Sequence, residues 1–429
     1  MILVDDLGYG DLGCQGSTDL DTPHVDRLAQ RGLRMTDFYA NCPVCSPTRA
    51  ALLTGRFQDL VGVPGVIRTH SKNSWGLLSR DATLLPAVLK KAGYRTAMIG
   101  KWHLGLGEPN LPNARGFDFF HGFLGDMMDD YWHHRRHGVN YMRLNRQVID
   151  PTGHATDLFT EWTCEWLRQY EQKEPFFIYL AYNAPHDPIQ PPPDWLARYE
   201  AKHTDATKRR ANIAAFIEHL DDGIGRVLST LRQTGHADDT LVIFTSDNGG
   251  ATWQGADNGP FSGAKQDMLE GGIRVPMCAA WPGRIEPGGT SNRVAMTMDL
   301  FPTICEAAGI DCDERLEGRS ILPTLLGKSQ PPEDRYLFWV RLEGNRKYHG
   351  TPYYAARRGQ WKLMQNTPDE ALRLYDIESD PRETTDLSEK RPEIFADLKR
   401  ALDAHIARCA KIPYRSPDGT GPGEIGPAE

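Results

Sequence analysis

The amino-acid sequence predicts an α/β protein: a large mixed, mostly parallel sheet flanked by helices, with a small C-terminal α+β subdomain. Three observations predict this class. Short apolar, β-rich runs alternate with amphipathic helical stretches over most of the chain. Acidic residues directly follow two of these runs, where ligands bind at the carboxyl ends of parallel strands. The chain of 429 residues is 40% hydrophobic, which is enough for a sizeable core.

Each element of the large sheet layer is expected from its local pattern. Short apolar runs predict strands at 2–4, 95–99, 176–182, 241–245 and 277–281. Apolar residues at helical spacing predict helices at 22–31, 47–55, 83–92, 155–170, 206–232 and 299–308. The segment 125–148 has no clear period and is rich in Asp, His, Arg, Tyr and Trp. We expect it to be an exposed loop insertion.

The chain is expected to divide at the proline-containing stretch 330–334 into domains of residues 1–330 and 331–429. The second is predicted to hold a four-stranded sheet and one helix. Its strand-like runs lie at 353–358, 360–364 and 372–377, and its helical pattern lies at 392–408. Residues 410–429 are rich in proline and glycine and are expected to form a mobile tail.

Charge and hydropathy weigh against two classes of protein. A net charge of -8 supplies no basic excess for a nucleic-acid partner. No apolar run approaches the roughly 18 residues that a membrane span requires. The chain as given begins without a signal peptide, but its first strand looks clipped, so we expect the true start to lie upstream. A cytoplasmic protein is the alternative.

Acidic and amide side chains follow two predicted strands at the point where each strand ends. Asp5 and Asp6 come after the strand at 2–4, and Asp247 and Asn248 follow the strand at 241–245. Three carboxylates and an amide oxygen form a hard donor set suited to Ca²⁺ or Mg²⁺. The alternative is helix capping and turn formation, which Asp and Asn also favour.

A cysteine stands at the start of a predicted helix. Pro47 suits the first turn of that helix, which places Cys45 just ahead of an N-terminus where free N–H groups favour an anion. Arg49 lies about one turn further on, so we interpret position 45 as an activated group facing an anionic ligand. An ordinary buried cysteine is the alternative. Cys42 gives CxxC spacing, but the chain offers no second pair or nearby histidine ligands for a redox or zinc site.

The motifs around these residues resemble those of the sulfatase family, in the expected order and over nearly the whole chain. CSPTR at 45–49 with LTGR at 53–56 matches the signature that directs oxidation of the cysteine to formylglycine. GYRTAMIGKWHLG at 93–105 matches the second family signature. Further matches are DDLGYG at 5–10, APHDP at 184–188, SDNG at 246–249, GAK at 263–265, EGGIRVP at 270–276 and LYDIESDP at 374–381.

The resemblance implies an alkaline phosphatase-like fold, with residues 1–330 as the catalytic domain, and hydrolysis of a sulfate monoester. A maturation enzyme would convert Cys45 to formylglycine, whose hydrate would attack sulfur. Ca²⁺, with Mg²⁺ as the alternative, would be held by Asp5, Asp6, Asp247, Asn248 and position 45. The resemblance also implies a periplasmic or extracellular location.

The catalytic residues that the resemblance implies are Cys45, Arg49, Lys101, His103, His186 and Lys265. His186 would protonate the leaving oxygen, and His103 would accept a proton when sulfate is expelled. Arg49, Lys101 and Lys265 would stabilise negative charge. Lys101 and His103 are two residues apart, so on an extended segment both side chains would point to one face.

The substrate-binding residues are expected mainly in the 125–148 segment, whose composition would suit a sugar ring with neighbouring sulfates or carboxylates. The candidates are Arg68, His70, Asp126, Asp129, Asp130, His133, His134 and Arg135. We hypothesise a sulfated saccharide attacked from its end, and a merely solvated loop is the alternative. Two rival functions stay open: a formylglycine-dependent phosphonate monoester or phosphodiester hydrolase, and a non-catalytic carbohydrate-binding relative.

Overall fold

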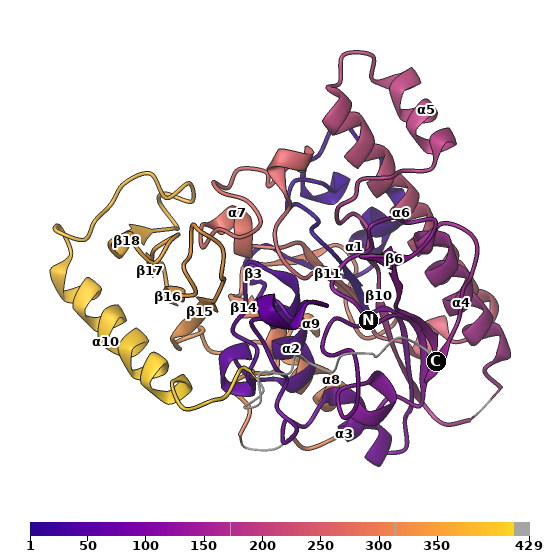
Figure 1. Cartoon of the computed structure of the whole chain (residues 1–429), viewed down its shortest axis with the longest axis horizontal. Coiled ribbons are helices and arrows are strands. Elements are labelled where there is room, and N and C mark those ends of the chain that lie inside the picture. The colour runs from indigo at the N-terminus through magenta and orange to yellow at the C-terminus, as the bar shows by residue number, and fades with distance from the viewer. Residues whose placement is uncertain (172, 313–314, 416–429) are drawn as a thin grey trace.

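The computed structural model describes residues 1–171, 173–312 and 315–415. Within these residues, ten strands form one central sheet (Figure 1). In spatial order they are β13 (Gly289–Ser291), β2 (Leu33–Met35), β12 (Met277–Ala280), β11 (Val242–Ser246), β1 (Ile2–Val4), β10 (Phe176–Ala181), β4 (Arg95–Lys101), β5 (Phe119–Phe123), β8 (Met142–Leu144) and β9 (Gln147–Val148). The strands from β11 to β5 are parallel, and antiparallel neighbours border them. The prediction of a mixed, mostly parallel sheet is confirmed.

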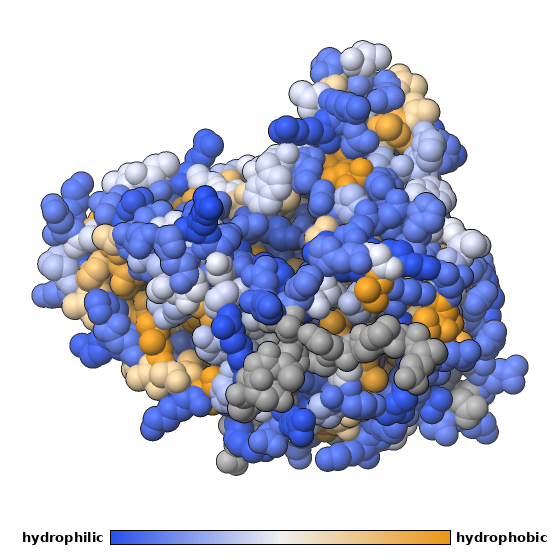
Figure 2. Space-filling view, in the orientation of Figure 1, coloured by the Kyte–Doolittle hydropathy of each residue, from blue (hydrophilic) through white to orange (hydrophobic). Residues whose placement is uncertain are grey.

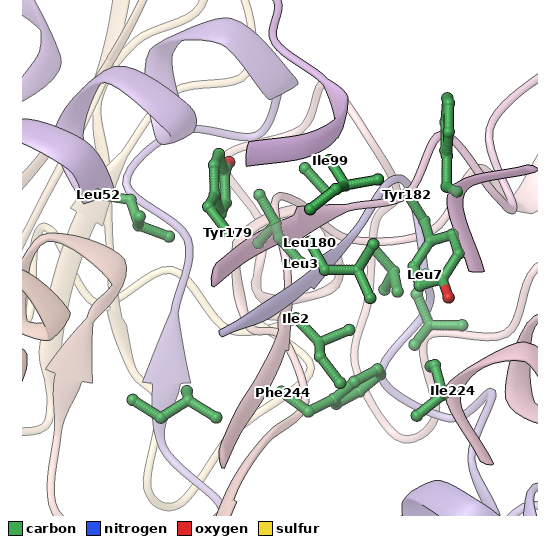
Figure 3. Packing of buried hydrophobic residues seen from close by; sticks show 14 of the residues in the cluster. Ile2, Leu3, Leu7, Leu52, Ile99, Tyr179, Leu180, Tyr182, Ile224 and Phe244 are labelled. Atoms are coloured by element: carbon green, nitrogen blue, oxygen red, sulfur yellow. The ribbon is translucent and has the colours of Figure 1, made fainter. Parts of the chain in front are cut away.

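Strand β1 lies in the middle of the sheet because its side chains are apolar and buried on both faces. Ile2 is the register partner of Leu180 on β10 and of Phe244 on β11. Figure 3 shows these side chains packed together with Leu3 and Leu7. The residues that follow β1 therefore emerge at the centre of one sheet edge.

Helices cover both faces of the sheet. One layer contains α1 (Pro23–Gln30), α4 (Ala155–Gln169) and α6 (Lys208–Gln233), and the other contains α2 (Cys45–Thr54), α3 (Leu85–Lys91) and α8 (Leu300–Ala307) (Figure 1). Helix α5 (Pro193–Lys202) packs on α6 at the edge of the molecule, and α7 (Glu270–Ile273) and α9 (Leu322–Leu325) are single turns. Each of the five predicted strands and six predicted helices of this domain lies within two residues of an observed element.

The expectation for the segment 125–148 is wrong in part. The hairpin of β6 (Arg135–Arg136) and β7 (Val139–Asn140) is followed by β8 and β9, which extend the central sheet. Met142 on β8 is fully buried. Strands of two or three residues are too short to show an alternation in the sequence. For the same reason the sequence analysis did not predict β2, β13 or the small parallel pair of β3 (Phe38–Tyr39) and β14 (Ala295–Met296).

The C-terminal subdomain is a four-stranded antiparallel sheet covered by one helix, as predicted. Its strands are β15 (Leu337–Arg341), β16 (Tyr353–Arg358), β17 (Trp361–Met364) and β18 (Arg373–Asp376), and α10 (Pro392–Cys409) packs on β16 and β17 (Figure 1). Trp339 and Tyr353 share a buried cluster with Tyr39 and Met268 of the large domain. We propose residue 330 as the boundary, and the predicted tail lies outside the described residues from 416 onward.

The surface in Figure 2 is mostly hydrophilic, with apolar side chains in small separate groups. The large exposed apolar side chains among the described residues are those of Trp132, Val139, Val148 and Trp253. Across the described residues, none of the helices combines the length and the apolar character that crossing a bilayer would demand.

Candidate active site

The carboxyl ends of neighbouring strands bring the predicted metal ligands together. Asp5 and Asp6 directly follow β1, and Asp247 and Asn248 directly follow β11. The two pairs are adjacent because the last residues of β1 and β11 are register partners. The backbone amide of Asp6, whose φ is 67°, donates to Oδ1 of Asp247 at 3.3 Å. This is the sheet edge at which parallel α/β proteins bind ligands.

The predicted catalytic side chains reach the same edge from separate elements. Lys101 ends β4, and His186 lies in the turn that follows β10. Cys45 and Arg49 lie on α2, and Lys265 lies in the loop before α7. All five are largely buried, so their charges act across a medium that screens them less than water does.

The acidic cluster fits a hard divalent cation. The side-chain amide of Asn248 donates to Oδ1 of Asp6 at 2.7 Å, which leaves its own oxygen free to point elsewhere. Within the described residues, Asp5 Oδ1 and Asn248 Oδ1 are buried and accept no hydrogen bond. Unpaired buried oxygens are costly, but they are the ligands that Ca²⁺ and Mg²⁺ prefer. Ligand atoms of Asp5, Cys45 and Asp247 also lie within 4.8 Å of one another.

The charges around Asp5 and Asp247 also favour a divalent cation at this cluster. Burial alone would raise the pKa of Asp5, but Lys101, His186 and Arg49 hold it well below its ordinary value. Burial and the neighbouring charge of Asp5 raise the pKa of Asp247 to about 7. Two carboxylates this close resist being ionised together, and a divalent cation between them would remove that conflict.

Arg49 and Lys101 form a buried cationic pair against these carboxylates. Arg49 donates to Oδ2 of Asp247 from Nε at 3.0 Å and from Nη2 at 2.7 Å, and Nη2 lies 3.3 Å from Oδ2 of Asp5. Its Nη1 donates to the carbonyl of Lys101 at 3.0 Å, and the ammonium of Lys101 donates to Asp5. Arg49 therefore fixes both the acidic cluster and the end of β4.

Lys265 and His186 contact the cluster at Asp6. Nζ of Lys265 lies 2.7 Å from Oδ2 of Asp6, and Nε2 of His186 lies 3.6 Å from the same oxygen. Nδ1 of His186 is 2.6 Å from the carbonyl of Asp187, which makes Nδ1 the donor and turns Nε2 toward the site. The hydroxyl of Tyr131 donates to the carbonyl of His186 at 3.0 Å and fixes this turn.

The prediction that Lys101 and His103 share the face of an extended segment is wrong. Strand β4 ends at Lys101, and His103 has a φ of 60°. The left-handed residue is held because Nε2 of His103 donates to the carbonyl of Ile67 at 2.8 Å. Nδ1 of His103 is buried and has no partner among the described residues. Burial, and then the charges of Lys101 and Arg49, lower the pKa of His103 well below its ordinary value, which favours the neutral ring.

Cys45 differs from the prediction in two respects. It is the first residue of α2, not the residue before the helix. Burial raises the pKa of its thiol to about 11, more than Lys101 lowers it, so the encoded thiol is not activated at neutral pH. Cys42 is also a free buried thiol and donates to the carbonyl of Val340 at 3.4 Å. Neither cysteine has the environment of a redox pair.

One end of the 125–148 segment lies next to the backbone of His103, and the ion pairs within the segment hold it together. Asp126 lies two residues beyond Leu124, whose carbonyl accepts the amide of His103 at 3.3 Å. Arg136 binds Asp126 at 3.0 Å and Asp129 at 2.8 Å, so these three form one charged group beside the site.

Four other candidates in this segment make local contacts instead. Asp130 accepts the backbone amides of the next turn and contacts the ring of exposed His133 at 2.9 Å. Arg135 pairs with Asp150 at 2.8 Å. His134 is fully buried and bonds the carbonyl of Gly153 at 2.9 Å, so the expectation that it binds substrate is not supported.

Arg68 and His70 approach the site from the segment after α2. Arg68 follows Ile67, the residue that holds His103, and its Nη2 lies 2.6 Å from Oε2 of Glu343. The ring of His70 lies 5.7 Å from that of His137, so this segment meets the 125–148 segment. Glu343 was missed in the sequence analysis, because its partner lies 275 positions away.

Two further groups of possible metal ligands lie apart from this site. In one, Nε2 of His405 lies 2.8 Å from Asp59 and 3.6 Å from the thiol of Cys409. In the other, His219 lies 3.0 Å from Asp157. The short histidine–carboxylate contacts explain both groups as hydrogen-bonded pairs.

Known proteins resemble the chain over most of its length. A model of the sulfatase family matches residues 1–310, and a model described as N-sulphoglucosamine sulphohydrolase, C-terminal, matches residues 261–410. N-acetylgalactosamine-6-sulfatase of Homo sapiens is 35% identical over 386 residues, which cover 84% of this chain and 70% of the relative. Arylsulfatase A of Homo sapiens is 32% identical over 457 residues, covering 93% and 86% respectively.

Solved structures agree with the sequence relatives. The crystal structure of Ps i-CgsB in complex with k-i-k-neocarrahexaose has a TM-score of 0.87 and 31% identity, and covers 97% of this chain and 95% of its own. The structure of BT4656 with its substrate D-glucosamine-2-N,6-O-disulfate has a TM-score of 0.77 and covers 96% and 97%. Its identity of 22% shows a common fold alone. Because the family model spans residues 1–310 and two named sulfatases exceed 30% identity, this chain belongs to the sulfatase family and is a sulfatase.

Proposed function

We propose that the chain is an exo-acting carbohydrate sulfatase that hydrolyses a sulfate monoester with formylglycine at position 45 and a divalent cation. The observation that carries this proposal is the meeting, beside Cys45, of buried cations with two buried oxygens that have no hydrogen-bond partner in the described part of the chain. A sulfate monoester is an anion whose charge shifts during cleavage. Arg49, Lys101 and Lys265 are placed to stabilise that charge in a site with little water.

Ca²⁺, with Mg²⁺ as the alternative, would be held by Asp5, Asp6, Asp247 and Asn248. The support is chemical, since all four offer hard oxygen ligands, and two of those oxygens are buried without a partner among the residues that the structure describes. Bound there, the cation would supply Lewis-acid stabilisation of a sulfate oxygen.

Formylglycine would supply, as its hydrate, a hydroxyl nucleophile and a second hydroxyl whose ionisation releases the product. The protein divides the proton transfers between two histidines. Because Nδ1 of His186 donates to a backbone carbonyl, Nε2 faces the site and, when protonated, can donate to the leaving oxygen. Because Nε2 of His103 donates to a backbone carbonyl, its Nδ1, which has no partner within residues 1–171, 173–312 and 315–415, can accept a proton.

The proposed substrate is a sulfated saccharide. Two relatives with at least 31% identity are named for, or crystallised with, a saccharide. Asp126, which forms one charged group with Asp129 and Arg136, lies two residues beyond Leu124, and Arg68, which pairs with Glu343, follows Ile67; Leu124 and Ile67 both hydrogen-bond His103. Such charged groups can hydrogen-bond to sugar hydroxyls and to a neighbouring anion.

Intact-mass and peptide analysis of position 45 tests the nucleophile. After co-expression with a maturation enzyme, the peptide should be about 18 Da lighter than the cysteine form. Cys45→Ala is the matched variant, which should fold but show no turnover. A fully active protein with unconverted Cys45 would contradict the proposed nucleophile.

Rates on paired substrates test the reaction class. An aryl sulfate should be hydrolysed far faster than the matching aryl phosphodiester, and a large preference for the diester would favour the rival hydrolase. No turnover of any ester by fully converted protein would favour the non-catalytic binding relative. A panel of sulfated oligosaccharides, compared with the aryl sulfate, then tests the substrate. Terminal desulfation should dominate, and activity on the aryl ester alone would contradict the saccharide proposal.

A further inference from the structure

The C-terminal subdomain binds the backbone of the segment that carries Lys265. Residues 265–270 run from the site to α7. Their backbone makes four hydrogen bonds with side chains of residues beyond 330, twice as the acceptor and twice as the donor. The side chains that make these bonds are Arg341, Tyr353, Asn366 and Glu383. The two nearest to Lys265 both bond Gln266.

Gln266 is held in a conformation that a non-glycine residue rarely adopts. Its φ is 81°, and this left-handed backbone needs support from its surroundings. Its amide donates to the carbonyl of Pro43 at 2.9 Å, two residues before Cys45. Its carbonyl accepts from Nη1 of Arg341 at 3.2 Å and from the hydroxyl of Tyr353 at 2.7 Å. Hydrogen bonds therefore fix both backbone polar groups of Gln266, and with them the peptide units on either side of it.

The two donors are themselves rigid and buried. Arg341 is 2% exposed and Tyr353 is 0% exposed, and the guanidinium of Arg341 donates to the hydroxyl of Tyr353. The rings of Tyr348 and Tyr353 stack at 4.9 Å, and Arg341 lies over Tyr348 at 4.8 Å from the ring centre. A packed cation–aromatic stack of this kind holds its donors in one geometry.

The same strand end also reaches the opposite side of the site. Nη2 of Arg341 donates to Oε2 of Glu343 at 3.3 Å, and Arg68 binds that oxygen at 2.6 Å. Arg68 follows Ile67, whose carbonyl holds His103. The end of β15 thus contacts the neighbours of both Lys265 and His103.

We propose that Arg341 and Tyr353 are positioning residues that set the place of the Lys265 ammonium at the sulfate-binding site. Neither touches the reacting atoms, and each acts through the carbonyl of Gln266. The inference rests on the proposed function in one respect, namely that Lys265 binds the sulfate group. A displacement of about 1 Å in such a group costs on the order of 100-fold in rate.

The test compares Tyr353→Phe and Arg341→Met with Tyr336→Phe and Arg358→Met. Both control residues belong to the same subdomain: Tyr336 directly precedes β15, and Arg358 ends β16 and pairs at the surface with Asp334. We expect kcat/KM for an aryl sulfate to fall about 5-fold in Tyr353→Phe and on the order of 50-fold in Arg341→Met, with controls unchanged. Arg341→Lys should recover part of the loss, since it keeps one donor.

A double-mutant cycle with Lys265→Ala separates positioning from general damage to the fold. In that background, Tyr353→Phe should cause no further loss of kcat/KM. An equal loss in both backgrounds would overturn the proposal, as would wild-type activity of both Arg341→Met and Tyr353→Phe.

Calorimetric binding of inorganic sulfate gives a readout that needs no turnover. Sulfate affinity should fall in Tyr353→Phe but not when Lys265 is already alanine. Failure of the wild-type protein to hydrolyse any sulfate ester would count against the proposed function alone, because the binding cycle is measured independently. An unchanged sulfate affinity in Tyr353→Phe and Arg341→Met would count against the positioning role.

Discussion

Lys362 is expected to be essential for joining the C-terminal subdomain to the large domain. This lysine on β17 is fully buried between two carboxylates, with Nζ 2.8 Å from Oε1 of Glu270 and 2.8 Å from Oε1 of Glu383. The contact with Glu383 is an ion pair that is poorly aligned for a hydrogen bond. Replacing Lys362 by methionine keeps the length of the side chain and removes its charge.

The expected loss of unfolding free energy follows from the two carboxylates, Glu270 and Glu383, that Lys362→Met would leave without their lysine partner. Breaking a buried ion pair by removing one partner costs about 3–5 kcal/mol of unfolding free energy. Arg274 remains 3.3 Å from Glu270 and still compensates part of its negative charge. We therefore expect a loss at the lower end of this range, about 3 kcal/mol, at pH 7. Burial and the neighbouring Glu270 raise the pKa of Glu383 to about 7. Protonation of Glu383 should therefore make the loss of unfolding free energy smaller at pH 6 than at pH 8.

Urea unfolding followed by circular dichroism measures this loss. The matched control is Lys399→Met, because Lys399 pairs with Asp403 at 2.6 Å in a largely exposed position on α10. Such surface pairs contribute little, so the control should stay within about 0.5 kcal/mol of wild type. A Lys362→Met protein within about 1 kcal/mol of wild type at pH 7 would refute the assignment of Lys362 as the buried charge that compensates Glu270 and Glu383.

Three further results are expected. Glu383→Gln should flatten the pH dependence of stability: the folded pKa of about 7 exceeds the ordinary 4.5, so wild-type unfolding free energy should fall by up to about 3 kcal/mol as pH rises through that window. An identical slope in urea titrations of the variant would contradict this. His103→Ala should lower kcat by about 10²–10⁴-fold through loss of the proton acceptor, with sulfate affinity retained, and a change in affinity alone would argue for a binding role. Chelation should lower the unfolding temperature, and Ca²⁺ at about 100 times its Kd should restore about 2.7 kcal/mol; no response to either treatment would speak against the metal site.

Local patterns predicted the elements that carry the site better than the elements at the sheet edges. The strand at 176–182 and the helix at 206–232 were found within two residues because their apolar runs are long. Strands β8 and β9 were missed because two or three residues show no period. His103 was placed in an extended segment, but its left-handed backbone depends on a bond to Ile67, 36 positions away.

The fold class, the family motifs and the placement of acidic pairs after two strands follow from the sequence, because these depend on residues that are neighbours in the chain. Tertiary packing was needed to show that the thiol of Cys45 is buried and protonated, and that Nδ1 of His103 has no hydrogen-bond partner among the described residues. It also decided that the C-terminal subdomain holds Gln266 beside Lys265, through partners 75 and 87 positions away. Contacts over such separations leave no local pattern, and the charges and hydrogen bonds they create exist only once the chain has packed.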